Sequence, residues 1–329
     1  MDTPFSDIPV ASPTTTTIYQ VVVTDAAGCT AVEQVKVTVN DCRRDQTTAA
    51  FESKTISLQA KVLLQGARVE GEDWMHDQLR TQQLIPLEEP YTTLSVFENF
   101  PPLFQLRRSG REQTTADVLA TTGANAIVDW VLVELRWEEN PSKILATKSA
   151  LLQRDGDIVD IDGISPVQFE IPEDRYFVAI RHRNHLGAMT ATALPFFPSA
   201  TVDFTDTNQS IYVLSDPDET SQYPMKSIDG KNYLWGGNAN GDNKIIFQGP
   251  NLDGEKLFFD IATHPDNAEV NYNFIYQGYL LGDLNLDGNL ILQGLKNDID
   301  DILFFNILLH EENERTLPNK IIFEQLPRR

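Results

Sequence analysis

The sequence predicts a mainly β protein, in which an antiparallel β-sandwich is followed by a small module of two repeated cation-binding loops, each leading into a helix. Two observations predict this arrangement. Short segments that alternate apolar and polar residues recur between Gly, Pro and Asp turns, which is typical of antiparallel sheets. An Asn-, Asp- and Gly-rich segment at 237–253 then returns 45 positions later, at 282–298.

Length and charge limit the organisation and the partners. With 329 residues the chain is long enough for more than one core, and we expect three parts, at 1–45, 46–205 and 206–329. Lys and Arg number 26 against 48 Asp and Glu, so the formal net charge is -22. This acidity argues against nucleic acid or anionic lipid as partners, because both require a positive surface. No apolar run approaches the roughly 20 residues that cross a bilayer, so we expect no membrane span.

The first part, 1–45, has the pattern of the last hairpin of an immunoglobulin-like (Ig-like) sandwich. Residues 18–24 and 33–39 alternate on either side of the turn 25–28. Two strands are too few for a sandwich, which needs about seven, so we expect the chain to be the end of something longer. The absence of a signal peptide then says little about location. Alternatively, the hairpin adds to the sheet of the next domain.

The two cysteines, Cys29 and Cys42, are too few for a disulfide scaffold or a cysteine-based zinc site. The alternating residues between them predict one extended strand, which advances about 3.3 Å per residue. A bond between the two would require the chain to fold back. We therefore expect Cys29 to belong to a bridge whose partner this sequence lacks.

The second part, 46–205, shows the regular strand spacing of a sandwich. One or two helical turns are expected at 74–80, and three aromatic residues, Trp130, Trp137 and Tyr176, are expected in the core, with a sugar-stacking platform as the alternative. The predicted strands cover 56–64, 127–136, 144–152, 158–161, 167–171 and 176–182.

Two polar clusters in this part have ordinary structural explanations. Four aspartates within 155–162 could hold a further ion, but Asp-Gly is a preferred hairpin turn and the spacing is not that of a calcium loop. The phrase Arg-His-Arg-Asn-His at 181–185 is expected to be a polar strand end. Its two histidines are three residues apart, so on a strand they would point to opposite faces, which is poor geometry for one metal ion.

Several phrases resemble a module at the C-terminal ends of large secreted and cell-surface proteins of the Bacteroidota, some of which carry hemagglutinin or dockerin-like labels. They lie at 63–66, 79–91, 127–136, 176–186 and 324–327, and residues 14–30 resemble the closing strands of PKD-like repeats in bacterial surface proteins. The resemblance implies an extracellular setting, where calcium is plentiful, and a place among adhesion or matrix proteins. It implies little about activity.

The repeated segment has the ligand spacing of a calcium loop. Oxygen side chains occupy alternate positions, as at positions 1, 3 and 5 of an EF-hand-type loop, and position 7 of such a loop binds through its backbone carbonyl. The expected residues at positions 1, 3, 5 and 7 are Asn238, Asn240, Asp242 and Lys244 in the first copy and Asp283, Asn285, Asp287 and Asn289 in the second. Position 6 needs a left-handed turn, which Asn243 and Gly288 tolerate.

Position 12 departs from the EF-hand pattern. Gly249 and Gly294 stand where an EF-hand has its bidentate Glu, and both copies offer an Asp four residues later, Asp253 and Asp298. We interpret the glycines as turns that delay the closing carboxylate until the next helix begins, where its charge suits the helix N-terminus.

A helix is expected after each loop, at 255–264 and 301–310. Both segments share the phrase Leu-Phe-Phe-x-Ile-x-x-His, with one extra residue before it in the second copy. Repeated apolar positions predict that the two loop–helix units pack together as a pseudo-twofold pair, as in a duplicated dockerin or paired EF-hands. His264 and His310 fall near the helix C-termini, where a capping role is favoured over metal binding.

The sequence thus predicts two structural calcium ions with affinities of about 10⁻⁴–10⁻³ M, as in extracellular modules. The alternative is a pair of Asn-rich surface turns. For the whole chain we expect a non-enzymatic, extracellular structural or adhesion module of a surface or filament-type protein. Its partners would be other surface-protein domains or copies of itself, through strand donation.

A different reading is a carbohydrate-binding accessory domain of a secreted hydrolase, with a glycan as partner. A glycosidase is disfavoured, because adjacent strand residues such as Glu138 and Glu139 point apart. No nucleophile elbow, P-loop or histidine-rich zinc motif appears in the sequence.

Overall fold

The computed structural model describes residue 13 and residues 17–37, 54–94 and 111–327. They belong to two compact units, residues 1–52 and residues 53–329. The second unit contains both the large sheet and the two repeated loops. No helix within the described ranges has the length and apolar character that a bilayer crossing requires.

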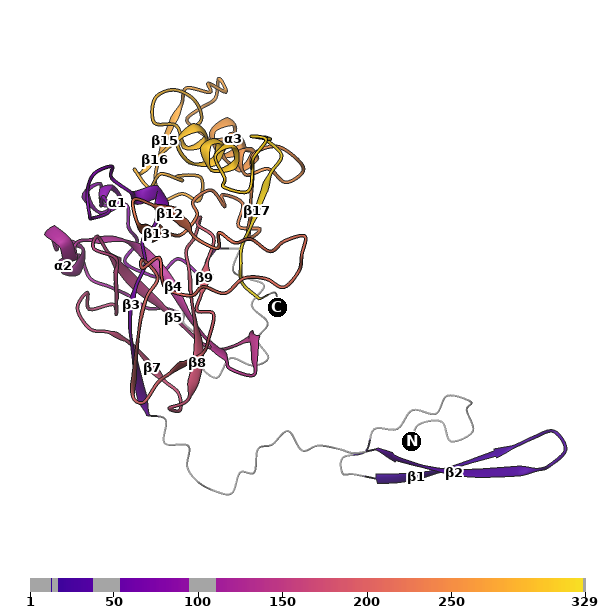
Figure 1. Ribbon diagram of the computed structural model, residues 1–329. Helices are drawn as coiled ribbons and strands as arrows, with labels where there is room; N and C mark the ends of the chain where they lie inside the picture. The colour runs from indigo at the N-terminus through magenta and orange to yellow at the C-terminus, as the bar shows by residue number, and fades with distance from the viewer. Residues whose placement is uncertain (1–12, 14–16, 38–53, 95–110, 328–329) are drawn as a thin grey trace. The chain divides into compact units, whose positions relative to one another are not determined.

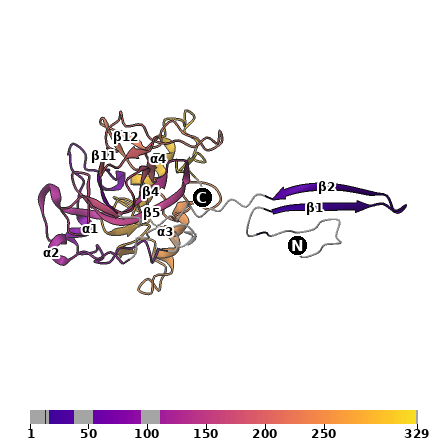
Figure 2. The same ribbon diagram turned by 90° about the horizontal axis from the view of Figure 1, so that it is seen from below.

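The first unit contains the predicted hairpin, seen as a two-stranded ribbon in Figure 2. Strand β1 (Thr17–Thr24) pairs antiparallel with β2 (Thr30–Val37). The Asp25 carboxylate closes the turn by accepting the backbone N–H groups of Ala27 and Cys29, both at 2.9 Å. Cys29 is exposed with a free thiol, and Cys42 lies outside the described residues.

The second unit is built on one large, mostly antiparallel sheet (Figure 1). The strand order is β10-β8-β4-β5-β6-β3-β11, with β7 also paired to β3 and β9 to β8. Only the pairing of β11 with β3 is parallel among the described strands. The bounds are β3 (Thr55–Lys61), β4 (Ile127–Trp137), β5 (Asn140–Gln153), β6 (Asp157–Val159), β7 (Val167–Glu170), β8 (Arg175–Arg181), β9 (Ala188–Met189), β10 (Leu194–Pro195) and β11 (Ser199–Asp203).

Strand β4 is the centre of this sheet. It pairs with β5 on one side and β8 on the other, and all but the last of its residues are buried. A strand that is covered on both faces has a nearly continuous apolar sequence. This explains why β4 is rich in Val and Leu. Trp130 is fully buried and Tyr176 nearly so, which confirms their place in the core. Trp137 at the strand end is half-buried, with the Lys143 ammonium 4.8 Å from its ring centroid.

The helical elements before the repeats are short. The helical turn expected at 74–80 is present as α1, which begins later, at Gln78. In α2, the Thr115 hydroxyl caps the N-terminus by accepting the Val118 N–H at 3.3 Å. The elements are η1 (Gln65–Ala67), α1 (Gln78–Thr81), α2 (Ala116–Leu119) and η3 (Gly123–Asn125).

The C-terminal region, as far as the structure describes it, holds the repeated loops with their helices and six short strands. Each helix follows its loop, but the second begins as a π-helix, which absorbs the one extra residue of that copy. The elements are β12 (Lys226–Ile228), β13 (Lys231–Tyr233), β14 (Lys244–Ile246), α3 (Asp253–Ala262), β15 (Ile275–Gln277), β16 (Asn289–Ile291), the π-helix η4 (Ile299–Phe304), α4 (Phe305–Leu308) and β17 (Ile321–Phe323).

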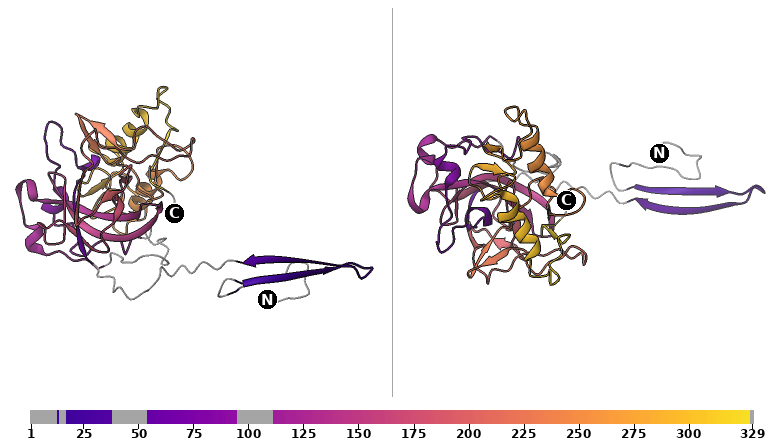
Figure 3. Two further views of the ribbon diagram at one scale, coloured as in Figure 1. Left: turned by 60° about the horizontal axis from the view of Figure 1, so that its bottom comes forward. Right: turned by 90° about the horizontal axis from the view of Figure 1, so that it is seen from above.

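The two repeats exchange strands. The loop strand of the first copy, β14, pairs with β17, which follows the second helix. The loop strand of the second copy, β16, pairs with β15, which follows the first helix. The helices, orange and yellow in Figure 3, share one buried core that includes Leu257 and Ile261 from α3 and Leu303 and Ile307 from the second helical segment. Each repeat therefore completes the other.

Candidate metal centres

The first loop curls around its own oxygen side chains. Asn240 Oδ1 accepts the backbone N–H of Asp242, and Asp242 Oδ1 accepts that of Lys244, each at 3.0 Å. Asn243 takes the left-handed conformation, with φ 66°. These local bonds orient side chains at alternate positions toward one side of the turn.

The second loop repeats this geometry. Asn285 Oδ1 accepts the Asp287 N–H at 3.1 Å, and Asp287 Oδ1 accepts the Asn289 N–H at 2.9 Å. Gly288 supplies the left-handed turn, with φ 85°. The left-handed turn expected at position 6 is therefore present in both copies.

The delayed aspartates close both loops from the start of the following helix. Asp253 is the first residue of α3, and Asp298 immediately precedes η4. Gly249 and Gly294 have φ values of 142° and 113°, a region that favours glycine. The chain thus turns at these glycines and brings the carboxylate back to the loop.

Both closing carboxylates are fully buried and bound to loop backbone. Asp253 accepts the Ile246 N–H at 2.8 Å and the Asn240 N–H at 3.3 Å. Asp298 accepts the equivalent N–H groups, from Ile291 at 2.9 Å and Asn285 at 3.3 Å. A carboxylate oxygen can accept these bonds and still use its second lone pair on a cation.

Position 1 of each loop holds a buried oxygen that has no hydrogen-bond partner. These oxygens are Oδ1 of Asn238 and Oδ1 of Asp283, on side chains that are 4% and 0% exposed. The other oxygen of Asp283 accepts the Gly288 N–H at 3.0 Å. Leaving a buried acceptor unsatisfied costs about 1–3 kcal/mol, so the same orphan at the same position of both copies fits a cation ligand.

The buried carboxylates also lack enough positive charge around them. Burial raises the pKa of Asp253 to about 8, and the nearby Asp242 adds to the effect. Burial raises the pKa of Asp283 to about 7, although the Arg183 guanidinium works against it. Burial and the charge of Asp283 raise the pKa of Asp298 well above its usual range. Hydrogen bonds from the backbone therefore offset the burial only in part, and a divalent cation would supply the missing charge.

The donor set is mixed rather than purely acidic. The described part of the chain contains no group of three or more His, Cys, Asp or Glu side chains that could hold a metal ion by themselves. A cation in these loops would depend on Asn oxygens and backbone carbonyls as well as carboxylates. All of these are hard oxygen donors, which suit calcium. The Lys244 ammonium lies 5.7 Å from the Phe323 ring centroid, and Lys244 would contribute its carbonyl.

The aspartates at 155–162 separate to different partners. Asp157 pairs with Lys61 at 2.9 Å, and Asp160 pairs with Lys148 at 2.6 Å. Asp162 accepts the backbone N–H of Ser165 at 2.8 Å. These contacts are those of a hairpin turn with flanking ion pairs.

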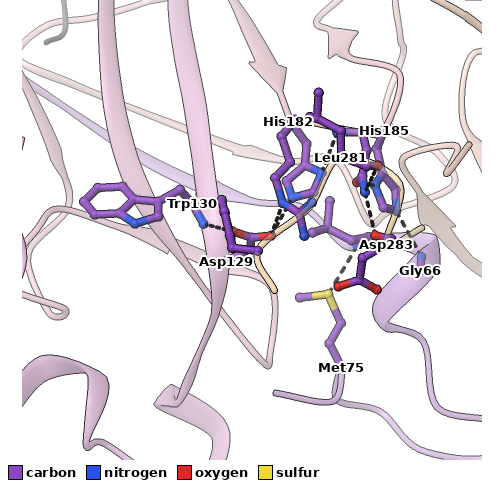
Figure 4. A network of polar contacts seen from close by, with 12 residues as sticks. Gly66, Met75, Asp129, Trp130, His182, His185, Leu281 and Asp283 are labelled. Carbon is purple, nitrogen blue, oxygen red and sulfur yellow. Dashed lines mark hydrogen bonds and ion pairs between the residues drawn. The ribbon is translucent and has the colours of Figure 1, made fainter. Parts of the chain in front are cut away.

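The strand-end phrase at 181–185 forms a buried network, shown in Figure 4. Strand β8 ends at Arg181, and the His182 and His185 rings then meet with centroids 4.8 Å apart. The expectation that they point to opposite faces is wrong, because the chain leaves the strand before His182. Asp129 binds His182 Nε2 at 3.1 Å and Arg183 Nε at 3.0 Å.

Asp129 stays ionised in this network. Burial alone would raise its pKa, but the Arg183 guanidinium and the His182 hydrogen bond hold it well below the usual range. The Tyr279 hydroxyl donates to the same carboxylate at 2.5 Å. Tyr279 lies between the two repeats, so the network joins the sheet to the repeated loops.

Asn184 is the residue of this site that the sequence reasoning missed. It is fully buried, and its backbone carbonyl accepts the N–H groups of Gly237 at 3.2 Å and Asn238 at 3.1 Å. Its side-chain amide donates to the carbonyls of Leu281 and Asp283. The only feature of the sequence that could have pointed to Asn184 is its place in a polar phrase directly after an apolar strand.

His264 and His310 act on the backbone after their helices. Each accepts, through Nδ1, the N–H of the residue two positions later, at 3.2 Å from Asp266 and 3.1 Å from Glu312. His310 also stacks on Trp235, with centroids 5.1 Å apart. In these contacts the rings accept N–H groups from the turn after the helix, whereas the expected capping of helix carbonyls would require them to donate.

Comparison of the chain with protein-family models, with curated proteins and with solved structures gives no match. The two loops are candidate metal centres because of their spacing, their buried oxygens and their common geometry.

Proposed function

We propose that the two loops bind one calcium ion each, and that the ions brace a non-enzymatic, extracellular structural or adhesion module of a bacterial surface or filament-type protein. The observation that carries the calcium proposal is the buried, unpartnered Oδ1 at position 1 of both loops. The ligands would be Asn238, Asn240, Asp242, Asp253 and the Lys244 carbonyl in the first loop, and Asp283, Asn285, Asp287, Asp298 and the Asn289 carbonyl in the second.

Calcium fits these donors better than other common ions. The side chains offer oxygen only, which disfavours zinc and copper relative to calcium or magnesium. Magnesium demands a strict octahedron and usually keeps several waters, whereas calcium accepts six to eight oxygens in flexible geometry. Loops with long, locally bonded turns and mixed amide, carboxylate and carbonyl donors support the larger ion.

The proposal also includes the type of two parts of the chain: the repeated loops and the first hairpin. A 1, 3, 5, 7 spacing followed by a helix supports a module of dockerin or EF-hand type, with a closing Asp in place of the position-12 Glu. The hairpin β1–β2 supports the end of an Ig-like repeat, because two strands alone cannot bury a core.

The role of the ions would be structural. In each loop the cation would hold the loop residues to the Asp that begins the next helix, and each loop strand is paired with the closing strand of the other repeat. Binding free energy that exists only in the folded state adds to folding stability. The ions would therefore stabilise the C-terminal repeats as a pair.

The surface role has support from the first unit. Three apolar side chains of the hairpin, Ile18, Val22 and Val23, are exposed by 61%, 56% and 62%, and such a ribbon has unpaired strand edges. Other surface-protein domains or further copies of this chain would cover it, in the second case by strand donation. Size-exclusion chromatography that gives only a compact monomer with a protected hairpin would exclude strand donation.

Two experiments test the two halves of the proposal. Isothermal titration of calcium into the EDTA-treated chain should give two ions per chain, and the absence of binding at millimolar calcium would refute the metal proposal. The adhesion role is tested by binding to cells, glycans and partner domains. A protein that stays monomeric and binds none of these would refute that role.

A further inference from the structure

Side chains that precede the repeats in the sequence donate hydrogen bonds to the backbone carbonyls of the second loop. Asn184 Nδ2 donates to the carbonyls of Leu281 at 3.0 Å and Asp283 at 2.7 Å. The dashed contacts of Figure 4 connect the strand-end network to this part of the loop. The backbone at position 1 is therefore held from outside while its side chain remains available inside.

Two more residues hold the next alternate carbonyls. His76 Nε2 donates to the Asn285 carbonyl at 3.1 Å, and Gln82 Nε2 donates to the Asp287 carbonyl at 2.5 Å. Because Nε2 of His76 faces two carbonyls, of Gly66 and Asn285, it carries the proton. Positions 1, 3 and 5 of the second loop are thus each bonded to a side chain from residues 76–184.

The first loop has no equivalent fastening. Among the described residues, no side chain donates a hydrogen bond to the carbonyls of Asn238, Asn240 or Asp242. Its outer contacts meet Asn243 at position 6 instead: the Glu324 N–H donates to the Asn243 carbonyl at 2.9 Å, and Arg181 Nη2 donates to Asn243 Oδ1 at 2.8 Å. The first loop is consequently held at its start and at position 6, rather than through the carbonyls of its ligand positions.

Charge also distinguishes the loops. The second loop carries Asp at position 1 where the first carries Asn238, so it has one more carboxylate. The Arg183 guanidinium near Asp283 opposes a cation, but it is paired with Asp129 at 3.0 Å. Ligand charge and site rigidity are the two properties that tune calcium affinity, and both favour the second loop.

We propose that the two sites are unequal: the second loop, preorganised by Asn184, His76 and Gln82, is the high-affinity site that fills first, and the first loop is the weaker site. This inference depends on the proposed calcium binding. A preorganised loop loses less conformational freedom on binding. Asn184, His76 and Gln82 are positioning residues, because they hold ligand-bearing backbone and need not touch the ion.

Calorimetric titration of calcium into the whole chain tests this order. The unaltered chain should show two binding phases, with Asp298→Asn removing the tighter one and Asp253→Asn the weaker one. Gln82→Ala, at the C-cap of α1, removes the bond to position 5. It should weaken the tighter phase by roughly three- to tenfold, leaving the weaker phase unchanged. Gln78→Ala, at the exposed first residue of α1, is the matched control and should change neither.

Four results separate the outcomes. Loss of the tighter phase in Asp253→Asn, or equal weakening of both phases by Gln82→Ala, would overturn the inference while leaving calcium binding intact. Two equal phases in the unaltered chain would overturn it as well. Absence of any calcium binding in the unaltered chain would instead refute the proposed function.

Discussion

Asn184 donates its side-chain amide to the backbone carbonyl of Asp283 at 2.7 Å. Its own carbonyl accepts the N–H of Asn238, at the same position of the other loop. One buried residue at the end of β8 thus contacts position 1 of both repeats. The large sheet and the repeats are joined at the place where each candidate metal centre begins.

The closing aspartates are expected to be essential for one ion each. Asp253→Asn and Asp298→Asn keep the size of the side chain but remove its charge and one acceptor oxygen. Each variant should bind one calcium ion where the unaltered chain binds two, as measured by metal content after equilibrium dialysis. Asp260→Asn on α3, where the carboxylate pairs with Lys256 at 2.5 Å on the surface, is the control and should retain both ions.

Stability without calcium is expected to fall as pH rises from 7 to 9. The folded-state pKa of Asp253, about 8, exceeds its unfolded value near 4 because the carboxylate is buried. The folded chain then holds a proton that the unfolded chain has lost, so this stabilisation is full below pH 4 and disappears through pH 8. Between pH 7 and 9 the loss is about 1 kcal/mol for this group.

Urea unfolding in EDTA at pH 7 and pH 9 measures this effect. Buried histidines such as His185, whose pKa burial lowers, act below pH 6.5 and do not interfere in this window. Excess calcium should abolish the pH dependence, because the ion displaces the proton. An ion-free stability that rises with pH would contradict the assignment of the buried carboxylates.

The core shared by the two helices should be sensitive to truncation. Leu257 on α3 is fully buried between the repeats, whereas Leu295 in the second loop is 94% exposed. Leu257→Ala should reduce the free energy of unfolding by about 2–5 kcal/mol through lost burial and a cavity. Leu295→Ala removes the same atoms from the surface and should change it by less than about 0.5 kcal/mol in urea unfolding. Equal effects of the two substitutions would contradict the shared core.

Glu324 is expected to anchor the C-terminal strand β17 to the sheet. Its carboxylate accepts the Gly187 N–H at 2.8 Å and pairs with Arg181 at 3.2 Å, and the residue is only 8% exposed. Glu324→Gln should lower the free energy of unfolding by about 1–3 kcal/mol, because the charge-assisted contacts weaken at a buried site. Glu269→Gln, at an exposed position, provides the control in the same urea titration.

The sequence was informative wherever the determinants are local. The apolar run of β4, the alternation in β3 and the turn around Asp25 depend on neighbouring residues, so these strands and the hairpin could be predicted. The turns of the two loops could also be predicted, because Asn, Asp and Gly at fixed spacing favour them. The late position of the closing carboxylate, at Asp253, could be predicted because Gly249 stands where an EF-hand has its Glu.

The remaining features depend on contacts between distant segments. The exchange of β15 and β17 between repeats has no local signature, since three-residue strands can pair with many partners. Asn184 and Gln82 look like ordinary polar residues until the fold places them against loop carbonyls about 100 and 205 positions away. The contact between the His182 and His185 rings was missed for a different reason: both histidines were placed on the strand, although β8 ends at Arg181.

Thermal unfolding with and without calcium tests the central claim most directly. With about 1 mM calcium, in the range where extracellular modules are filled, the melting temperature of the second unit should rise above its value in EDTA, as mass action requires for an ion that binds only the folded state. The double variant Asp253→Asn/Asp298→Asn should lose this rise. An identical melting temperature in EDTA and in calcium would contradict the account.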